Sequence, residues 1–171
     1  ASDLHGKFFV VDTFTNKPLS GNPAAVLFIR DNASAFTEKQ FIRLAQDIAS
    51  VEVAVVLPPV DPKSDFCLRF FTKNTETPFC GHATLAAAHA IMQNVSTFKN
   101  ASEVLFTMAK MGPSVISVKK LDGEGKLELM VKPTLPKRKE MCKEESAKLA
   151  ACLSLASPER AVFAHTSGKN L

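Results

Sequence analysis

The sequence predicts an α+β fold in which a mixed sheet wraps around one apolar helix. Residues 81–92 (GHATLAAAHAIM) form an Ala-rich helix with almost no polar face, and a short helix that is apolar all round belongs inside a core. Short strand-like runs precede and follow this helix in the sequence, so a sheet is available to cover it. Of the 171 residues, 46% are hydrophobic and 22% are charged, which is the ordinary range for a globular chain.

Four strands are expected before the central helix. The run 7–14 (KFFVVDTF) reads as a buried strand, and the segment 16–23 (NKPLSGNP) after it is dense in turn residues. The apolar run 24–29 is the second strand. The run 51–57 is the third and ends at two prolines, and the run 65–71 (DFCLRFF) is the fourth.

An amphipathic helix is expected between the second and third strands. Thr37 is the expected N-cap, because Gln40 follows three residues later and the pair fits a capping box. The apolar residues of the segment 38–48 recur at helical spacing. The segment 72–79 then reads as a loop that leads into the central helix.

The strands expected after the central helix cover residues 104–108, 114–118 and 127–131. The turn at 122–125 (DGEG) joins the last two of them as a hairpin. An amphipathic helix is expected at 140–153, one more strand at 160–165, and a turn at 166–170.

Composition argues against nucleic-acid binding. Trp and Tyr are absent, although nucleic-acid-binding proteins often use these rings to stack bases. The net charge is +4, and part of it comes from the basic run 132–139 with Lys143 and Lys148 nearby. This region is interpreted as a solvated linker and its following helix. A phosphate-binding patch is the alternative, but it would need more clustering and a Gly-rich or aromatic partner.

Neither a metal site nor a membrane segment is expected. The four Cys form no C-x-x-C pair, and no Cys/His cluster has zinc spacing. No apolar segment is long enough to span a membrane, and none opens the chain as a signal peptide would. A cytoplasmic protein is therefore expected.

Glu52 is the first residue that could carry chemistry. It is the only carboxylate in a Val-rich run, and in a strand it shares one face with Ala54 and Val56. Such a side chain lies either on a solvent face or in a partly dry pocket. In a pocket, burial favours the protonated acid, and the group could move a proton near neutral pH. The local sequence leaves both environments open.

Gly81 and His82 fall where the central helix begins. The free N–H groups of a helix N-terminus bind anions, and glycine lets a ligand approach the backbone closely. A substrate that bears a carboxylate would suit this position, and His82 could add a donor or a proton relay. The alternative is that His82 only caps a buried helix end. His89, two turns further on, is too far away to chelate one metal with His82 and is expected either in the core or behind the residues that touch the substrate.

These signals occur in an order that resembles the phenazine-biosynthesis-like (PhzF) family. The segment 11–15 (VDTFT) and the turn 21–26 (GNPAAV) resemble the opening of its members, although such a turn alone is common. The segment 44–54 resembles the family's helix and glutamate strand. The segment 69–86, which contains PFCGHATLA, resembles its most specific motif. The matches together span about residues 7–92.

The resemblance implies the diaminopimelate-epimerase-like fold, in which two similar domains each wrap a sheet around a central helix and the active site lies between them. It also implies an isomerase that uses no metal or organic cofactor and acts on a small carboxylate-bearing substrate. The family's best-known reaction is the isomerisation of trans-2,3-dihydro-3-hydroxyanthranilate. Glu52 matches the glutamate that moves the proton. Gly21, Asn22, Gly81 and His82 are expected to bind the substrate, and a homodimer is expected.

Two departures from the family pattern stand out. The family usually has Ser before the glutamate, and here Val51 stands there. Members also carry a second domain with its own Gly-Ser/Thr-Ala-like motif, and nothing after Arg138 supplies it. We therefore expect an N-terminal domain at 1–132 and a linker with the truncated start of a second domain at 133–171. Little activity is expected of this chain alone. The alternative is a non-catalytic interaction protein, since half a fold exposes an apolar cleft face and a strand edge.

Overall fold

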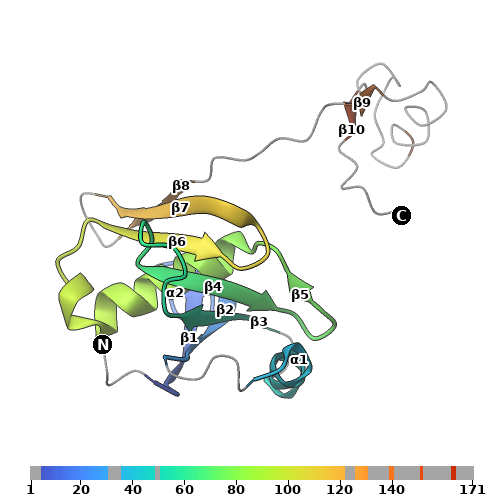
Figure 1. Cartoon of the computed structure of the whole chain (residues 1–171), viewed down its shortest axis with the longest axis horizontal. Coiled ribbons are helices and arrows are strands. Elements are labelled where there is room, and N and C mark those ends of the chain that lie inside the picture. Colours follow the sequence, from blue (N-terminus) through green and yellow to red (C-terminus); the bar gives the residue numbers. More distant parts are fainter. Residues whose placement is uncertain are drawn as a thin grey trace. The chain divides into compact units, whose positions relative to one another are not determined.

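The computed structural model describes residues 5–30, 36–48, 51–121, 126–130, 139–140, 151 and 163–164. The chain divides into two compact units, residues 1–131 and residues 132–171. Figure 1 shows the elements of both. The interpretation of residues 133–171 as the start of a second domain stays a prediction.

The first unit is built on one mixed sheet. Its strands are β1 (Phe8–Thr13), β2 (Asn22–Phe28), β3 (Glu52–Leu57), β4 (Phe66–Phe71), β5 (Glu76–Thr77), β6 (Glu103–Met108), β7 (Gly112–Lys120) and β8 (Leu127–Met130). The strand order is β1-β2-β3-β4-β6-β7-β8, with β5 paired to β4 at the side of this path. The pairs β2–β3 and β4–β6 are parallel, whereas the other neighbours are antiparallel. Mixed pairing of this kind is typical of an α+β fold.

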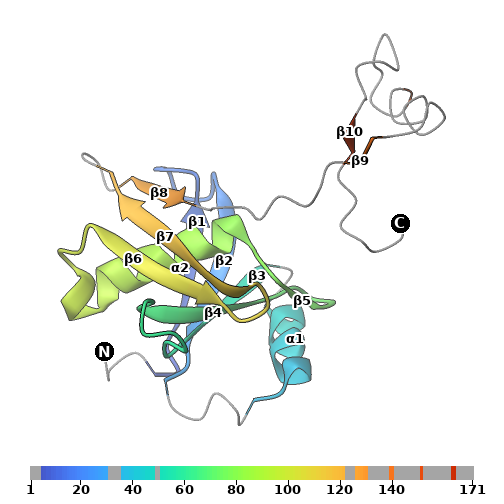
Figure 2. The ribbon, with the colours of Figure 1, turned by 45° about the horizontal axis from the view of Figure 1, so that its top comes forward.

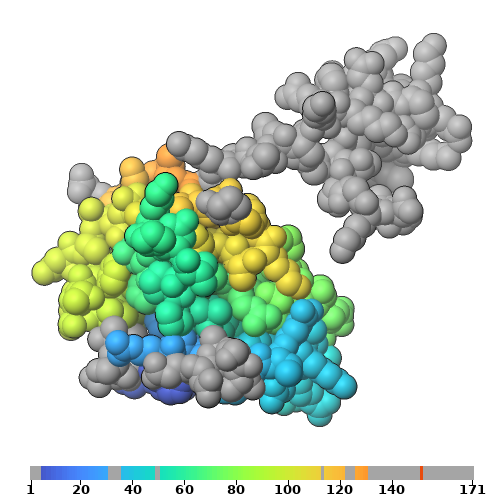
Figure 3. Space-filling view, viewed as in Figure 1, coloured from blue at the N-terminus to red at the C-terminus, as the bar shows by residue number. Residues whose placement is uncertain are grey.

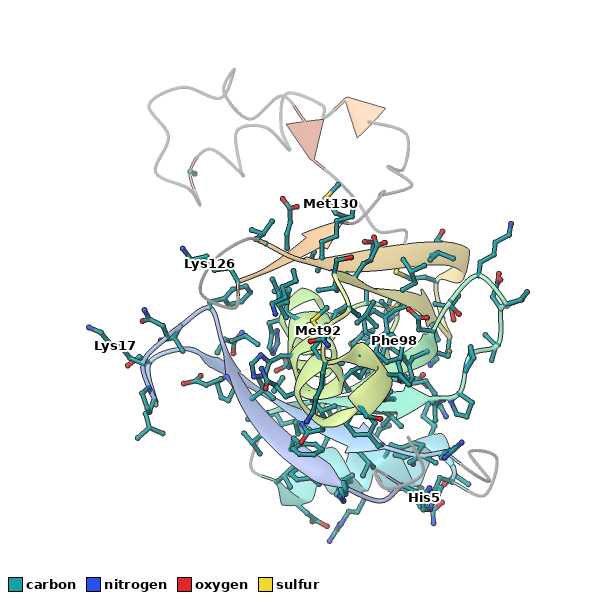
Figure 4. The ribbon with its side chains drawn as sticks, turned by 90° about the vertical axis from the view of Figure 1, so that its left-hand side faces the viewer. His5, Lys17, Met92, Phe98, Lys126 and Met130 are labelled. Atoms are coloured by element: carbon teal, nitrogen blue, oxygen red, sulfur yellow. The ribbon has the colours of Figure 1, made fainter. Side chains whose placement is uncertain are left out.

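The central helix, α2 (Gly81–Asn94), lies inside the curl of this sheet (Figure 2). It packs against β1, β2 and β3 on one side and against β7 and β8 on the other. Figure 4 looks nearly along its axis, with β1 on one side and β8 on the other. The buried helix residues are mostly small: Ala83, Thr84, Ala86, Ala87, Ala88, Ala90, Ile91 and Met92. The predicted apolar helix is confirmed, because small side chains let the sheet approach the helix backbone on nearly every side.

One narrow side of α2 is open, and there the expectation that His89 lies in the core is wrong. His89 and Gln93 are exposed and Leu85 is half-buried. These residues follow each other at helical spacing and face the gap between the two edge strands. His89 therefore lies on the surface and not in the core.

The second helix, α1 (Glu38–Asp47), covers the opposite face of the sheet. Thr37 caps it, and the Thr37 and Gln40 side chains each bond the other's backbone, so the predicted capping box is confirmed. Phe41 and Ala45 of this helix pack with apolar residues of β2, β3 and β4 in a separate small core. In Figure 3, α1 forms the cyan corner of the visible face.

Local differences from the sequence predictions occur where turns and strands meet. The expected loop 72–79 contains the short strand β5, because the chain folds back on β4. β2 begins at Asn22, inside the expected turn, since Asn22 pairs with Thr13 of β1. The antiparallel pairing of β7 with β8 confirms the predicted hairpin. Its turn at 122–125 lies outside the described residues.

The second unit contains two described strands, β9 (Lys139–Glu140) and β10 (Phe163–Ala164), which pair antiparallel. β10 agrees with the strand expected at 160–165. Glu140 was expected to begin a helix and instead lies in a strand, where its backbone pairs with Phe163. Ala151 is helical as expected, and the other residues of that helix and the turn at 166–170 lie outside the described residues. No described helix is both long enough and apolar enough to cross a membrane.

Candidate active site

Three elements of the first unit begin at the same place. β2 and β3 are parallel, and Ala24 pairs with Glu52, so both strands start at one end of the sheet. The first turn of α2 lies beside this end, because the helix packs against both strands. The fold thereby brings Glu52 of β3 next to His82 of α2, although the two residues are 30 positions apart in the sequence.

The Glu52 side chain lies on the strand face that packs against α2, and it is also partly exposed to solvent. Ala54 and Val56, which share its strand face, are buried in the core around α2. The Glu52 side chain is 37% exposed, since it sits at the open end of that core. Val51, where the family usually has Ser, packs with the α1 core on the opposite face of the strand. Its methyl groups therefore fill space behind the strand.

The Glu52 carboxylate and the His82 imidazole lie side by side. His82 Nε2 is 3.4 Å from Glu52 Oε2, and the His82 side chain is 12% exposed. The distance is that of an ion pair, but the angles do not make a hydrogen bond, so the buried Nε2 has none among the described residues. A buried nitrogen without a hydrogen bond costs free energy unless a ligand or water completes it. This atom is therefore a buried polar group without a hydrogen-bond partner among the described residues.

The N-terminus of α2 offers further donors. Cys80 is the N-cap residue and its side chain makes no capping hydrogen bond. The Thr84 N–H and hydroxyl both donate to the Cys80 carbonyl oxygen, at 3.0 and 2.8 Å. The first N–H groups of a helix have no partner within the helix, so those of Gly81 and His82 are free for an anion. A Cβ on Gly81 would meet other atoms only at 3.7 Å or more.

Cys80 is the residue at this site that the sequence reasoning missed. Its Sγ lies 3.3 Å from His82 Nδ1, on the far side of the ring from Glu52. Burial raises the pKa of the Cys80 thiol above its usual value, the Ala83 N–H opposes this rise, and the negative charge of Glu52 adds to it. The spacing Cys80-Gly81-His82 across a helix start could have indicated the contact, because residues i and i+2 can meet where the backbone changes from extended to helical.

Gly21 ends the turn before β2 and Asn22 begins that strand, and the two residues play different parts. The Gly21 N–H is bound by the Asp12 carboxylate at 3.1 Å, so it is not free for a ligand. A Cβ on Gly21 would lie 2.1 Å from the Thr13 carbonyl oxygen, which only glycine avoids. Asn22 is exposed, and its side-chain amide has no hydrogen bond within the described part of the chain.

A buried ion pair fixes the segment that leads into α2. Arg69 of β4 bonds both oxygens of Glu76 of β5 at 2.9 Å, and Lys110 adds a contact of 3.1 Å. Burial alone would raise the pKa of Glu76, but the hydrogen bonds and charges of Arg69 and Lys110 outweigh it and hold that pKa below its ordinary value. The Arg69 guanidinium also stacks on Phe41 and Phe71. β5 is thus anchored four residues before Cys80.

Neither of two hollows on the described surface is lined by Glu52 or His82. The larger, of about 1120 Å³, runs beside β1 and the open side of α2 past Leu85 and His89. The smaller, of about 370 Å³, includes His89, Lys99 and Lys120. The described residues also contain no group of three or more His, Cys, Asp or Glu arranged to hold a metal ion. The Glu52–His82 pair is therefore an open half-site in this unit.

Comparison with known proteins decides the family. The family model described as "Phenazine biosynthesis-like protein" matches residues 11–171. The chain belongs to this family. A crystal structure of a PhzC/PhzF protein of Clostridium difficile resembles it with a TM-score of 0.61 and 26% identity, over 85% of this chain and 51% of that one. The predicted α+β, diaminopimelate-epimerase-like fold is thereby confirmed.

Two curated relatives carry the name isomerase. The chain is 33% identical over 118 residues to the trans-2,3-dihydro-3-hydroxyanthranilate isomerase of Pseudomonas aeruginosa, which covers 69% of this chain and 39% of that protein. It is 44% identical over 77 residues to the uncharacterized isomerase YddE of Escherichia coli, which covers 45% of this chain and 24% of that protein. The matched parts thus span less than half of the length of either relative.

Proposed function

We propose that this chain carries the glutamate half of the active site of a cofactor-independent isomerase. The observation that supports this most is the Glu52–His82 pair, with Nε2 and Oε2 3.4 Å apart at the free N-terminus of α2. A carboxylate beside a helix N-terminus can take up a proton while the helix holds a second, anionic group of the same molecule. The isomerases among the relatives support the reaction class.

In the proposed reaction, Glu52 removes a proton from a carbon next to an unsaturated, carboxylate-bearing system. The electron pair left by the broken C–H bond moves into that system, and the double bond shifts. Glu52 then returns the proton to a different carbon, so the product has the atoms of the substrate in a new arrangement. No electrons enter or leave, and no co-reactant is consumed.

The substrate carboxylate would lie against the N–H groups of Gly81 and His82. His82 Nε2 would donate to a substrate oxygen that gains negative charge as the proton leaves, which stabilises the transition state more than the ground state. Asn22, on the neighbouring strand, has a free amide that could bind the substrate's second polar group. Gly21 would contribute indirectly, by shaping the turn before Asn22.

The test is turnover by the native protein isolated from its source, with trans-2,3-dihydro-3-hydroxyanthranilate as the first compound. Uptake of deuterium from D₂O into the product reports the proton transfer directly. Glu52→Gln should lower the turnover by about 10²- to 10⁴-fold, the usual contribution of a general acid–base group. Glu128→Gln, at an exposed carboxylate on β8, is the matched control and should keep full turnover.

Retention of turnover by the folded Glu52→Gln protein would contradict the proposal. Turnover of a different carboxylate-bearing compound with the same dependence on Glu52 would keep the mechanism and change the substrate. A homodimer and a cytoplasmic location stay predictions, to be checked by sedimentation and by fractionation of the source cells.

A second candidate function is an interaction protein without catalysis. Three exposed apolar side chains of β1 and the β1–β2 turn favour it: Val10 is 62% exposed, Phe14 72% and Leu19 99%. Exposed apolar residues that lie close together mark contact surfaces. Replacement of Phe14 and Leu19 by Ser should then abolish self-association in sedimentation, while Glu52→Gln changes nothing. The isomerase proposal predicts the reverse in the turnover assay: Glu52→Gln lowers the turnover, and replacement of Phe14 and Leu19 by Ser does not.

A further inference from the structure

The His82 imidazole lies between a thiol and a carboxylate. Cys80 Sγ is 3.3 Å from Nδ1 on one side, and Glu52 Oε2 is 3.4 Å from Nε2 on the other. The two ring nitrogens are distinct, and a neutral imidazole carries its proton on only one of them. What each nitrogen faces therefore decides which tautomer is present.

Only one tautomer suits the charge and lone pairs of both neighbours, even though the angle at Nε2 does not make a hydrogen bond to Glu52. With the proton on Nε2, the ring presents an N–H to the Glu52 side, and the Nδ1 lone pair can accept the S–H of Cys80. With the proton on Nδ1, the Nε2 lone pair would face the lone pairs of the carboxylate, and sulfur, a weak acceptor, would have to receive the N–H. Burial raises the pKa of the Cys80 thiol, so the sulfur keeps the hydrogen that this arrangement needs.

We propose that Cys80 is a positioning residue whose thiol donates to His82 Nδ1 and so holds the His82 proton on Nε2, directed toward Glu52. The role of the pair follows from this. His82 acts as a donor, and Glu52 is the group of the pair that can accept the substrate's proton. The catalytic significance of this tautomer rests on the proposed function. Its test, however, does not use turnover.

The other described cysteine provides the control. Cys67 lies in β4, is 1% exposed, and pairs with Thr107 of β6 and not with His82. Cys67→Ala removes a buried thiol of the same kind from the same unit. It should lower stability without changing the tautomer of His82, so it separates a general packing effect from the proposed one.

The experiment is ¹H–¹⁵N NMR of the histidine rings in the full chain, at alkaline pH where imidazoles are neutral. His82→Gln assigns the His82 signals. In the unmodified chain, Nδ1 should resonate as an unprotonated nitrogen and Nε2 as a protonated one. Cys80→Ala should move both signals toward the average of the two tautomers. Cys80→Ser should keep the unmodified pattern, since a hydroxyl can donate to Nδ1 as the thiol does.

Two results would overturn the proposal: a proton on Nδ1 in the unmodified chain, or an unchanged tautomer in Cys80→Ala. Backbone ¹H–¹⁵N spectra verify that each variant is folded, and Cys80→Ser provides the answer if Cys80→Ala is not. Loss of the tautomer preference in Cys67→Ala would also count against it. Since no substrate is present, failure here leaves the role of Glu52 standing, and failure of the Glu52→Gln turnover test leaves this result standing.

Discussion

Glu76 shows how one buried side chain supports a site that it does not touch. Its side chain is 2% exposed, and both of its oxygens are held by Arg69 while Lys110 contacts one of them. A buried carboxylate is tolerated only when it is paired in this way. The pair fixes β5 against β4, and the chain then runs directly to the N-terminus of α2.

Glu76→Gln should lower the free energy of unfolding by on the order of 3 kcal/mol near neutral pH, the lower end of the range for a broken buried pair, since Lys110 is partly in solvent. The pair lowers the pKa of Glu76 from its ordinary value of 4.5. Its stabilisation is therefore complete above that value and is lost as the pH falls through the lower, folded-state value. Urea unfolding across the acidic range should show a flatter pH dependence in the variant. An equal slope in both proteins would contradict this account.

Substitution by alanine should destabilise the protein at Gly21 but hardly at Gly81. A Cβ on Gly21 would lie 2.1 Å from a backbone oxygen, whereas one on Gly81 meets nothing closer than 3.7 Å. Gly21→Ala should cost about 1–3 kcal/mol of unfolding free energy, as overpacking does. Gly81→Ala should change it by less than about 0.5 kcal/mol. Urea denaturation of the two variants decides the matter, and equal losses would refute the distinction.

At the site, sequence reasoning could find residue types but not contacts. A lone carboxylate in a strand and a histidine at a helix start predict Glu52 and His82 separately, but only the packing of α2 against β2 and β3 places them together. Cys80 was missed because a cysteine carries no charge pattern of its own. The assignment of roles to these residues stays a prediction until turnover is measured.

Among the elements, α2 depends most on the size of its side chains. Ala87 is fully buried near the middle of the helix, where the sheet leaves no room. Ala87→Leu should lower the free energy of unfolding by about 1–3 kcal/mol through overpacking. Gln93→Leu places the same side chain on the open side of the same helix and should change it by less than about 0.5 kcal/mol. Thermal or urea unfolding of both variants measures the difference, and similar losses would argue against a tightly wrapped helix.

The elements that could be predicted are those with a strong local pattern. The capping box before α1 and the apolar run of α2 each specify a helix without help from the rest of the chain. β5 and the start of β2 could not be predicted, because two or three residues become strand only through a partner already in place. Glu140 stands at the start of an amphipathic sequence pattern, but its backbone pairs with β10, and periodicity does not reveal such a pairing.

Within the described part of the first unit, the candidate site is open. Glu52 is 37% exposed, and the two described hollows lie elsewhere. Proton transfer between carbons needs a site that excludes water and holds the substrate in place. The first unit supplies one wall of such a site. A closed site would need a second wall, which the described residues of this unit do not supply.

This chain by itself should turn over trans-2,3-dihydro-3-hydroxyanthranilate at least about 100-fold more slowly than the trans-2,3-dihydro-3-hydroxyanthranilate isomerase of Pseudomonas aeruginosa, because even a small misplacement of reacting groups costs that much. Deuterium uptake by NMR measures both rates under one set of conditions. Glu52-dependent turnover by the chain alone at a rate typical of enzymes would show that one wall is sufficient.

The hydrogen bonds of α2 have a mechanical consequence. Among the residues that the structure describes, its side chains make hydrogen bonds only within the helix and its N-cap: Thr84 to the Cys80 carbonyl, Asn94 to the Ala90 carbonyl, and His82 Nδ1 with the Cys80 thiol. The described ion pair between the helix and a surrounding strand is His82–Glu52 at the first turn, so most of the resistance of the helix to sliding along its own axis comes from interlocked methyl groups. The repulsion between packed methyl groups rises steeply at short distances, and it opposes movement of the helix toward either end. A force applied along the axis at the His82 end would therefore be transmitted through the whole length of the helix.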